Sequence, residues 1–179
     1  MKIFKPLVLF FLLFTGIGLT AQDIPEPMSP PRLVNDFAGI LTAGQIRHLE
    51  QKLVAFDDST STQILVILVK SLNGLTKEEF ADRVGEKWGV GRQGKNNGIV
   101  VLVKPKYGND KGQARISTGY GVEGAVTDAL GKRIVEQEMI PYFKMGDYFT
   151  GLDKATSTLI SLTKGAFTAE EYVKGAKGS

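Results

Sequence analysis

The chain has no cysteine and only one histidine, His48, among its 179 residues. Without cysteine it can form no disulfide, thiolate nucleophile, thiolate zinc site or iron–sulfur cluster. A single histidine argues against a histidine-rich zinc site and against a Ser-His-Asp triad. The fold must therefore depend on its apolar core, and the chain is long enough to build one domain of this kind.

Long apolar runs are also scarce, and the longest, residues 7–19, directly follows the charged residues Lys2 and Lys5. A positive start, a short apolar stretch and small residues ending at Ala21 are typical of a signal peptide. We therefore expect residues 1–21 to be a leader cleaved after Ala21. The protein is then periplasmic or secreted, with no stable membrane anchor after cleavage. A retained N-terminal anchor is the alternative, whereas a lipoprotein anchor is excluded because no cysteine follows the run.

Charge of one sign is not in large excess, since 22 basic residues face 19 acidic ones and give a formal net charge of +3. Lys2 and Lys5 are the only charged residues of the leader, so its removal lowers the net charge to +1. A nearly neutral surface gives no reason to expect a nucleic-acid partner.

The rest of the chain divides by composition. Residues 22–31 hold four of the seven prolines, and we expect them to form an extended linker. Residues 32–165 show no internal repeat and no second boundary, so they are expected to form one domain. Residues 166–179 are expected to be a short helical or disordered tail.

Capping boxes and apolar periodicity predict the helices. One helix is expected to begin after Thr42 and to end near residues 57–59, and a second begins after Thr76 and includes Trp88. A third is expected from about residue 128 to about residue 139, where Pro141 stops or kinks it. A fourth follows Asp147.

Continuous apolar runs at residues 63–69 and 99–103 predict strands that are covered on both faces. Residues 113–118 alternate between apolar and polar side chains, and their short connection to the preceding strand predicts an antiparallel hairpin. Alternating helices and strands favour an α/β fold, a three-layer α/β/α sandwich with a small mixed central sheet.

Two glycine-rich loops resemble nucleotide-binding motifs but fail on inspection. In residues 89–98, Asn96 stands where a phosphate-binding P-loop needs Ser or Thr, and the order is helix, loop, strand. In residues 119–124, Glu123 would lie beside the pyrophosphate of a dinucleotide, and no second parallel strand follows. We therefore expect no nucleotide ligand.

The same loops carry oxygen ligands for a hard cation, at Asn96, Asn97, Glu123 and Asp128. Calcium and magnesium prefer carboxylate and carbonyl oxygens, and open sheets place ligands in the crevice at strand ends. The alternative interpretation is that Asn-Asn-Gly is only a turn and Asp128 only a helix cap.

Several ordered motifs resemble the TPM domain family over roughly residues 32–165. They are the segments 35–41 (NDFAGIL), 88–98 (WGVGRQGKNNG), 117–128 (STGYGVEGAVTD), 140–143 and 146–148. The resemblance implies an α/β/α sandwich and binding of divalent cations in some members. Thylakoid-lumen relatives are linked to photosystem II repair and to acid phosphatase activity. Another relative associates with ligand-gated receptors at the nematode synapse.

The resemblance also implies a site. With the family added, we expect Asp36 and Asp128 to converge with Asn97 and Glu123 at one end of the sheet and to bind Ca²⁺ or Mg²⁺. The competing interpretation is that Asp36 and Asp128 only cap helices and pin loops. Asn96 replaces the Asp that the family commonly has there, which removes a carboxylate. The expected phosphate or ligand contacts are Arg92, Lys95, Asn96, Gly119, Tyr120 and Gly121.

Two functions follow as expectations. The first is an exported envelope module that binds a divalent cation and a protein partner and helps to maintain membrane complexes. The second is a weak metal-dependent acid phosphatase that uses the same loops, with metal neutralising phosphate and activating water. The sequence has no Asp-x-Asp nucleophile motif, no catalytic histidine and no cysteine, so we favour the binding module.

Overall fold

A computed structural model describes residues 24–175, so the expected leader and the last four residues lie outside the described part. Four strands form one sheet: β1 (Val34–Asp36), β2 (Gln63–Leu68), β3 (Gly98–Lys104) and β4 (Gln113–Thr118). The helices are α1 (Ala43–Thr60), α2 (Lys77–Trp88), α3 (Asp128–Ile134), the π-helix η1 (Val135–Met139), α4 (Ile140–Lys144), α5 (Tyr148–Thr163) and α6 (Ala169–Gly175).

The sheet is mixed, with strand order β1-β2-β3-β4. β1, β2 and β3 run parallel, and β4 closes an antiparallel hairpin with β3, as predicted. Five of the six β2 residues and all seven of β3 are buried, which explains their unbroken apolar sequences. In the register of the parallel strands, Asp36 pairs with Leu68 and Leu68 with Val103, so these three residues lie at one end of the sheet.

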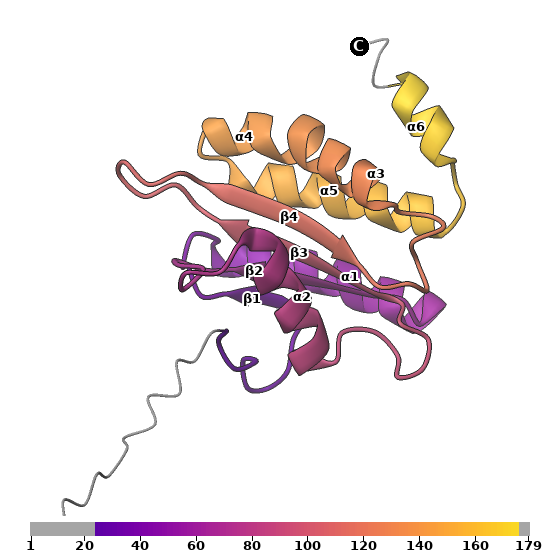
Figure 1. Cartoon of the computed structure of the whole chain (residues 1–179), viewed down its shortest axis with the longest axis horizontal. Coiled ribbons are helices and arrows are strands. Elements are labelled where there is room, and N and C mark those ends of the chain that lie inside the picture. Colours follow the sequence, from indigo (N-terminus) through magenta and orange to yellow (C-terminus); the bar gives the residue numbers. More distant parts are fainter. Residues whose placement is uncertain (1–23, 176–179) are drawn as a thin grey trace, which may run out of the picture.

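Helices cover both faces of the sheet, which confirms the expected α/β/α sandwich (Figure 1). Alternate residues of β3 face opposite sides of the sheet and pack in two separate core clusters. Val101 packs in the larger cluster with α1, α3 and α5, whereas Val100 packs in the smaller cluster with α2. The smaller layer consists of α2 and the N-terminal segment. Because only one long helix covers this face, part of the β3–β4 surface beside α2 is left open.

The predicted caps are present. Thr42 and Thr76 each form a complete capping box, and the Asp147 carboxylate accepts a hydrogen bond from the backbone N–H of Thr150 at 3.0 Å. The third helix does not stop at Pro141, which was one of the two outcomes expected there. The chain passes through the π-helical turn η1 and continues into α4, where Pro141 occupies the first turn and needs no N–H partner.

The proline-rich segment is not a free linker, which corrects the sequence-based expectation. Ile24 is 3% exposed and packs in the smaller core cluster. The indole N–H of Trp88 donates to the carbonyl of Pro25 at 3.0 Å, and Lys87 pairs with Glu26 at 2.7 Å. The segment therefore belongs to the same layer as α2, because its side chains and backbone contact residues of that helix.

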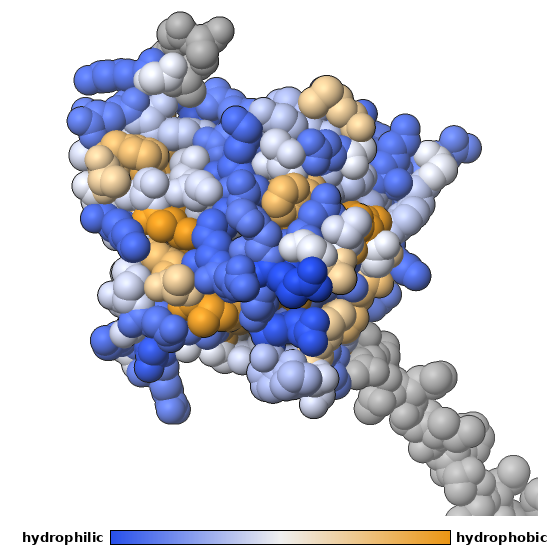
Figure 2. Space-filling view, turned by 180° about the vertical axis from the view of Figure 1, so that it is seen from behind, coloured by the Kyte–Doolittle hydropathy of each residue, from blue (hydrophilic) through white to orange (hydrophobic). Residues whose placement is uncertain are grey.

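The outer surface is mixed in character. Figure 2 shows apolar residues as separate patches among polar ones on the face opposite to that of Figure 1. Within residues 24–175, no helix is long and apolar enough to cross a membrane.

Candidate functional site

The two glycine-rich loops meet at one end of the sheet, which we call the loop end. The first glycine loop comprises residues 89–97 and the second comprises residues 119–124. The N–H of Gly121 donates to the carbonyl of Asn96 at 2.9 Å, and the N–H of Gly119 donates to the carbonyl of Gly98 at 2.9 Å. The second loop therefore lies directly against the first.

Glycine is required at this contact. A Cβ atom on Gly119 would lie 2.2 Å from the carbonyl oxygen of Asn96, and one on Gly121 would lie 2.1 Å from that of Lys95. Both obstacles are backbone atoms, which cannot move aside as a flexible side chain can. Gly119 and Gly121 are thus required by the close backbone packing of the two loops.

Asn97 holds the first glycine loop in place. Its side chain is buried, and its Oδ1 accepts a hydrogen bond from the N–H of Arg92 at 2.8 Å. Its Nδ2 donates to the carbonyl of Ser61 at 2.7 Å, which links the loop to the end of α1. Because both ends of the amide are engaged, Asn97 is a structural residue rather than a side chain directed at a ligand.

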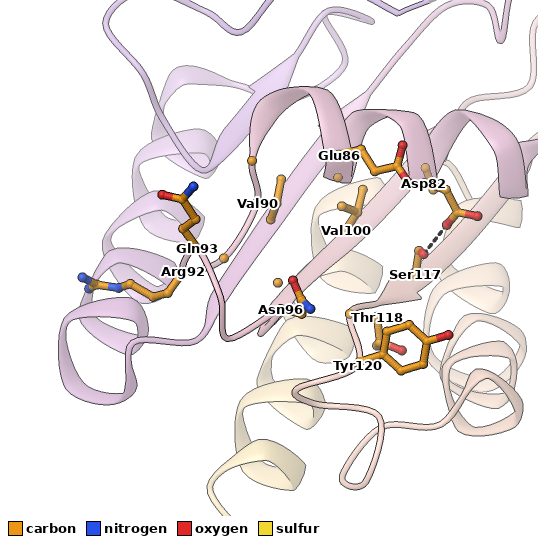
Figure 3. Close-up of a pocket in the computed structure, with 16 residues that line it drawn as sticks. Asp82, Glu86, Val90, Arg92, Gln93, Asn96, Val100, Ser117, Thr118 and Tyr120 are labelled. Atoms are coloured by element: carbon orange, nitrogen blue, oxygen red, sulfur yellow. Dashed lines mark hydrogen bonds between the residues drawn. The ribbon is translucent and has the colours of Figure 1, made fainter.

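A pocket of about 770 Å³ opens where α2, the first glycine loop and the end of β4 come together. Figure 3 shows α2 along one side and Tyr120 across from it, with Asn96 between them. The lining residues from α2 are Ala81, Asp82, Gly85 and Glu86; those from the loop and β3 are Gly89, Val90, Gly91, Arg92, Gln93, Asn96, Gly98 and Val100; those from β4 and the second loop are Ser117, Thr118, Gly119 and Tyr120.

The α2 side of the pocket is acidic. Asp82 and Glu86 lie one helical turn apart on the same face of α2, and both residues are exposed. The hydroxyl of Ser117 donates to Oδ1 of Asp82 at 2.6 Å. In the described part of the chain, no lysine or arginine forms an ion pair with either carboxylate. The pocket therefore presents two carboxylates that are available to a cationic ligand.

The opposite side of the pocket is aromatic and neutral. Tyr120 is 85% exposed, the highest value among the large apolar side chains described. Arg92 lines the pocket, but its guanidinium is directed away from Asp82 (Figure 3) and lies 3.8 Å from Asp57 of α1. The basic group expected to contact phosphate thus faces away from the acidic wall.

The structure separates Asp36 from the loop end, which corrects the expected convergence. Asp36 is level with Val103 in the sheet register, whereas Asn97 precedes Gly98 at the other end of β3. Six residues of strand span roughly 20 Å. The Asp36 carboxylate accepts N–H bonds from Gly39, Ile40 and Leu41 at 2.8–2.9 Å, so it pins the turn after β1.

The remaining predicted residues lie near the loop end but outside the pocket lining. Asp128 is exposed at the start of α3, and its Oδ1 lies 2.9 Å from the Arg115 guanidinium. Thr127, not Asp128, caps that helix. Glu123 and Lys95 are exposed in their loops. The structure thus brings four of the predicted residues to the pocket lining, Arg92, Asn96, Gly119 and Tyr120. The others lie outside it: Asp36, Lys95, Asn97, Gly121, Glu123 and Asp128.

Sequence reasoning missed Asp82, Glu86 and Ser117. The available signals were the four-residue spacing of two acids opposite the apolar stripe of α2, and the exposed position of Ser117 in an alternating strand.

The described part of the chain has no large cluster of acidic side chains. Within residues 24–175, no three Asp, Glu or His side chains are close enough together to hold a metal ion. A cation in the pocket would therefore be held by two carboxylates together with neutral oxygens. Among the lining residues, Ser117 carries a hydroxyl bonded to Asp82 and Asn96 carries an amide oxygen, and oxygen ligands of these kinds suit hard cations.

The sequence profile of the TPM domain family matches residues 34–162. The N-terminal domain of a protein from P. gingivalis, whose structure was solved by NMR, is 30% identical to this chain. The alignment covers 75% of this chain and 83% of that one, with a TM-score of 0.65. A search of curated protein sequences gave no match.

Two further NMR structures share the fold. The N-terminal domain of cg2496 from Corynebacterium glutamicum is 16% identical, with 77% of this chain and 84% of that one covered and a TM-score of 0.58. The BA42 protein from Bizionia argentinensis is 18% identical, with 72% and 84% covered and a TM-score of 0.55.

Proposed function

The chain belongs to the TPM domain family, and from that premise we propose that it is an exported binding module of the cell envelope. Its pocket between α2 and β4 holds a divalent cation, Ca²⁺ or Mg²⁺, and faces a protein partner in the maintenance of membrane complexes. The observation that carries this proposal is the pair of carboxylates on α2. Asp82 and Glu86 are exposed, line one pocket and have no basic partner in the described chain.

The oxygen donors around this pair suit a hard cation. Asp82 and Glu86 supply negative charge, and Ser117 and Asn96 supply neutral oxygens from β4 and the first glycine loop. Divalent cations in such sites keep several waters, and sites with few carboxylates bind weakly. We therefore expect dissociation constants of about 10⁻⁴ to 10⁻³ M, the range of extracellular calcium modules.

Tyr120 supports a role in protein binding. It stands 85% exposed at the edge of the pocket, where an aromatic side chain offers a large apolar surface and a hydroxyl. Tyrosine is enriched among the residues that dominate protein–protein binding energies. A partner that packs on Tyr120 would also cover the pocket and exclude water from the bound cation.

The binding role is favoured over the weak metal-dependent phosphatase. A phosphate group entering the pocket would meet Asp82 and Glu86, while the Arg92 guanidinium is directed toward Asp57. The enzyme role would use the Ser117 hydroxyl, which donates to Asp82 at 2.6 Å. Both roles would use the same pocket, so activity measurements with and without the cation distinguish them.

The first experiment is titration of the purified protein with Ca²⁺ and with Mg²⁺, followed by amide NMR shifts. We expect shifts at residues 82–86, 96 and 117–120 for the wild type, and their loss in the double variant Asp82→Asn, Glu86→Gln. Glu123→Gln removes an exposed acid outside the pocket lining and is the matched control. Shifts that persist unchanged in the double variant would contradict the proposed site.

The second experiment measures phosphate release from an aryl phosphate over the same cation range. The binding role predicts no cation-dependent turnover above that of the double variant. Turnover that needs the cation and disappears in Ser117→Ala would favour the enzyme instead. Circular dichroism of each variant checks that the fold is retained.

A further inference from the structure

The turn of the β3–β4 hairpin projects from the end of the sheet opposite the glycine loops (Figure 1). It comprises residues 105–112, between the last residue of β3 and the first of β4. The turn between α4 and α5, residues 144–147, lies at the same end. We call these two turns together the tip.

The two turns touch each other. The backbone N–H of Lys106 lies 3.4 Å from the hydroxyl of Tyr148, the first residue of α5. The Tyr148 ring packs on the ring of Phe143 of α4, with the centroids 4.8 Å apart. The hairpin turn and the α4–α5 turn therefore form one continuous surface.

The tip is basic. Lys106, Lys111 and Lys144 are exposed, and no ion pair involves any of them in the described part of the chain. Asp110 is bound to the ammonium group of Lys104, so its charge is offset within the hairpin. Asp147, the other acid of the tip, caps α5 and is only partly exposed.

Two large apolar side chains protrude among these lysines. Met145 is 71% exposed and Tyr107 is 40% exposed. They are two of the four large apolar side chains that stand out as exposed in residues 24–175. Tyr107 follows Lys106 in the hairpin turn and Met145 follows Lys144 in the α4–α5 turn, so each turn places an exposed apolar side chain next to an exposed lysine.

We propose that the tip docks on an anionic phospholipid surface, with the lysines at the headgroups and Tyr107 and Met145 inserted among them. Lysines close to an anionic membrane each contribute about fivefold in binding. Tyrosine favours the interface between headgroups and acyl chains because its ring is apolar and its hydroxyl is polar. The combination gives weak, reversible binding, in contrast to a spanning helix.

A lipid surface fits the tip better than an acidic protein. Lys106 and Lys111 lie in the hairpin turn and Lys144 lies in the α4–α5 turn, so the positive charge is spread over two turns rather than gathered at one point. A membrane accommodates this spread, because anionic headgroups diffuse to the charges. Protruding Met and Tyr side chains also gain more from an acyl boundary than from a charged protein surface.

This inference does not depend on the proposed cation pocket. It also predicts how the pocket would be oriented relative to the membrane. The strand β3 separates the tip from the first glycine loop along its whole length, Gly98–Lys104. A domain docked by the tip would therefore hold Tyr120 and the carboxylates of α2 away from the lipid. A partner in the envelope would reach them from the aqueous side.

The test is co-sedimentation of the purified protein with vesicles of phosphatidylglycerol and, separately, of phosphatidylcholine, in the presence of a chelator. Every protein has the same N-terminus, checked by mass, so that a retained leader cannot explain a difference. We expect binding to phosphatidylglycerol only, weakened by salt because screening acts on exposed charges. The variant Lys106→Gln, Lys111→Gln should bind about 25-fold more weakly, from about fivefold for each lysine.

Matched variants complete the design. Lys95→Gln removes an exposed lysine at the loop end and should bind like the wild type. Tyr107→Ser with Met145→Ser should bind more weakly at every salt concentration, since salt does not screen the apolar contribution. Asp82→Asn with Glu86→Gln should keep full binding, which separates this proposal from the cation pocket.

Several outcomes would overturn the docking proposal. One is wild-type binding to neither vesicle, and another is equal loss of binding in Lys95→Gln and in the double lysine variant. A third is binding to poly-glutamate without binding to phosphatidylglycerol, which would assign the tip to an acidic protein.

Discussion

The hydroxyl of Ser117 on β4 donates a hydrogen bond to Oδ1 of Asp82 on α2, at 2.6 Å. This bond joins an edge strand to the helix that covers it, at the point where the open β3–β4 surface begins. It leaves the second oxygen of Asp82, and both oxygens of Glu86, without a protein donor in the described part of the chain. This contact therefore links α2 to β4 and still leaves most of the carboxylate oxygens on the α2 side open to a ligand.

Asp36 is expected to stabilise the fold without binding the cation. Replacing it by Ala removes the acceptor for three backbone N–H groups and should lower the free energy of unfolding by about 2–3 kcal/mol, because hydrogen bonds to charged groups are the stronger ones. Urea unfolding measures this loss. The exposed Asp58→Ala is the control, and a loss of cation-induced NMR shifts in Asp36→Ala would contradict the assignment.

Gly121 is expected to tolerate no side chain. Gly121→Ala places a Cβ 2.1 Å from the carbonyl of Lys95 and should push the two glycine loops apart, at a cost of about 1–3 kcal/mol or more. Gly124→Ala is the matched control, since a Cβ there meets nothing within 4 Å. Equal thermal stability of the two variants would show that the loops do not pack as described.

Glu138 is expected to make stability depend on pH. Burial raises the pKa of this carboxyl above its ordinary value of 4.5, although the hydroxyls of Tyr172 and Thr158 oppose the shift. Its Oε2 is buried without a partner. The folded state thus holds the proton more tightly than the unfolded state, so stability falls as the pH rises from 4.5 through the folded pKa.

Glu138→Gln keeps an oxygen acceptor for Tyr172 and Thr158 but removes the titration. Its free energy of unfolding should therefore lack that decline and exceed the wild-type value at neutral pH. Urea unfolding over a pH series tests this, with the exposed Glu136→Gln as control. Wild-type and Glu138→Gln curves that run parallel across the series would refute the prediction.

Packing of the N-terminal segment on α2 is expected to be detectable by the fluorescence of Trp88, the only tryptophan of the chain. Ile24→Ala removes a buried anchor and should cost about 2–5 kcal/mol if the site cannot collapse. Because the indole N–H of Trp88 donates to Pro25, loosening the segment should also shift Trp88 emission to longer wavelength. Val54→Ala, at an exposed position, is the control. An unshifted spectrum in Ile24→Ala would argue against packing of the N-terminal segment on α2.

Much of the fold could be predicted because its signals are local. A capping box is complete within four residues, so Thr42 and Thr76 marked the starts of α1 and α2 correctly. The strands β2 and β3 could be predicted to be buried, because their sequences are continuous runs of apolar residues. β1 was not predicted as a strand, because three residues are too few to show a period.

The site depended on tertiary structure. The sequence alone determined the fold class, the family and the presence of two glycine-rich loops, since each is written in contiguous residues. It did not determine that Asp36 and Asn97 lie at opposite ends of the sheet, or that Asp82, Ser117 and Tyr120 share one pocket. Those relationships follow from strand register and from the face on which α2 packs, and both are set by contacts between residues far apart in the chain.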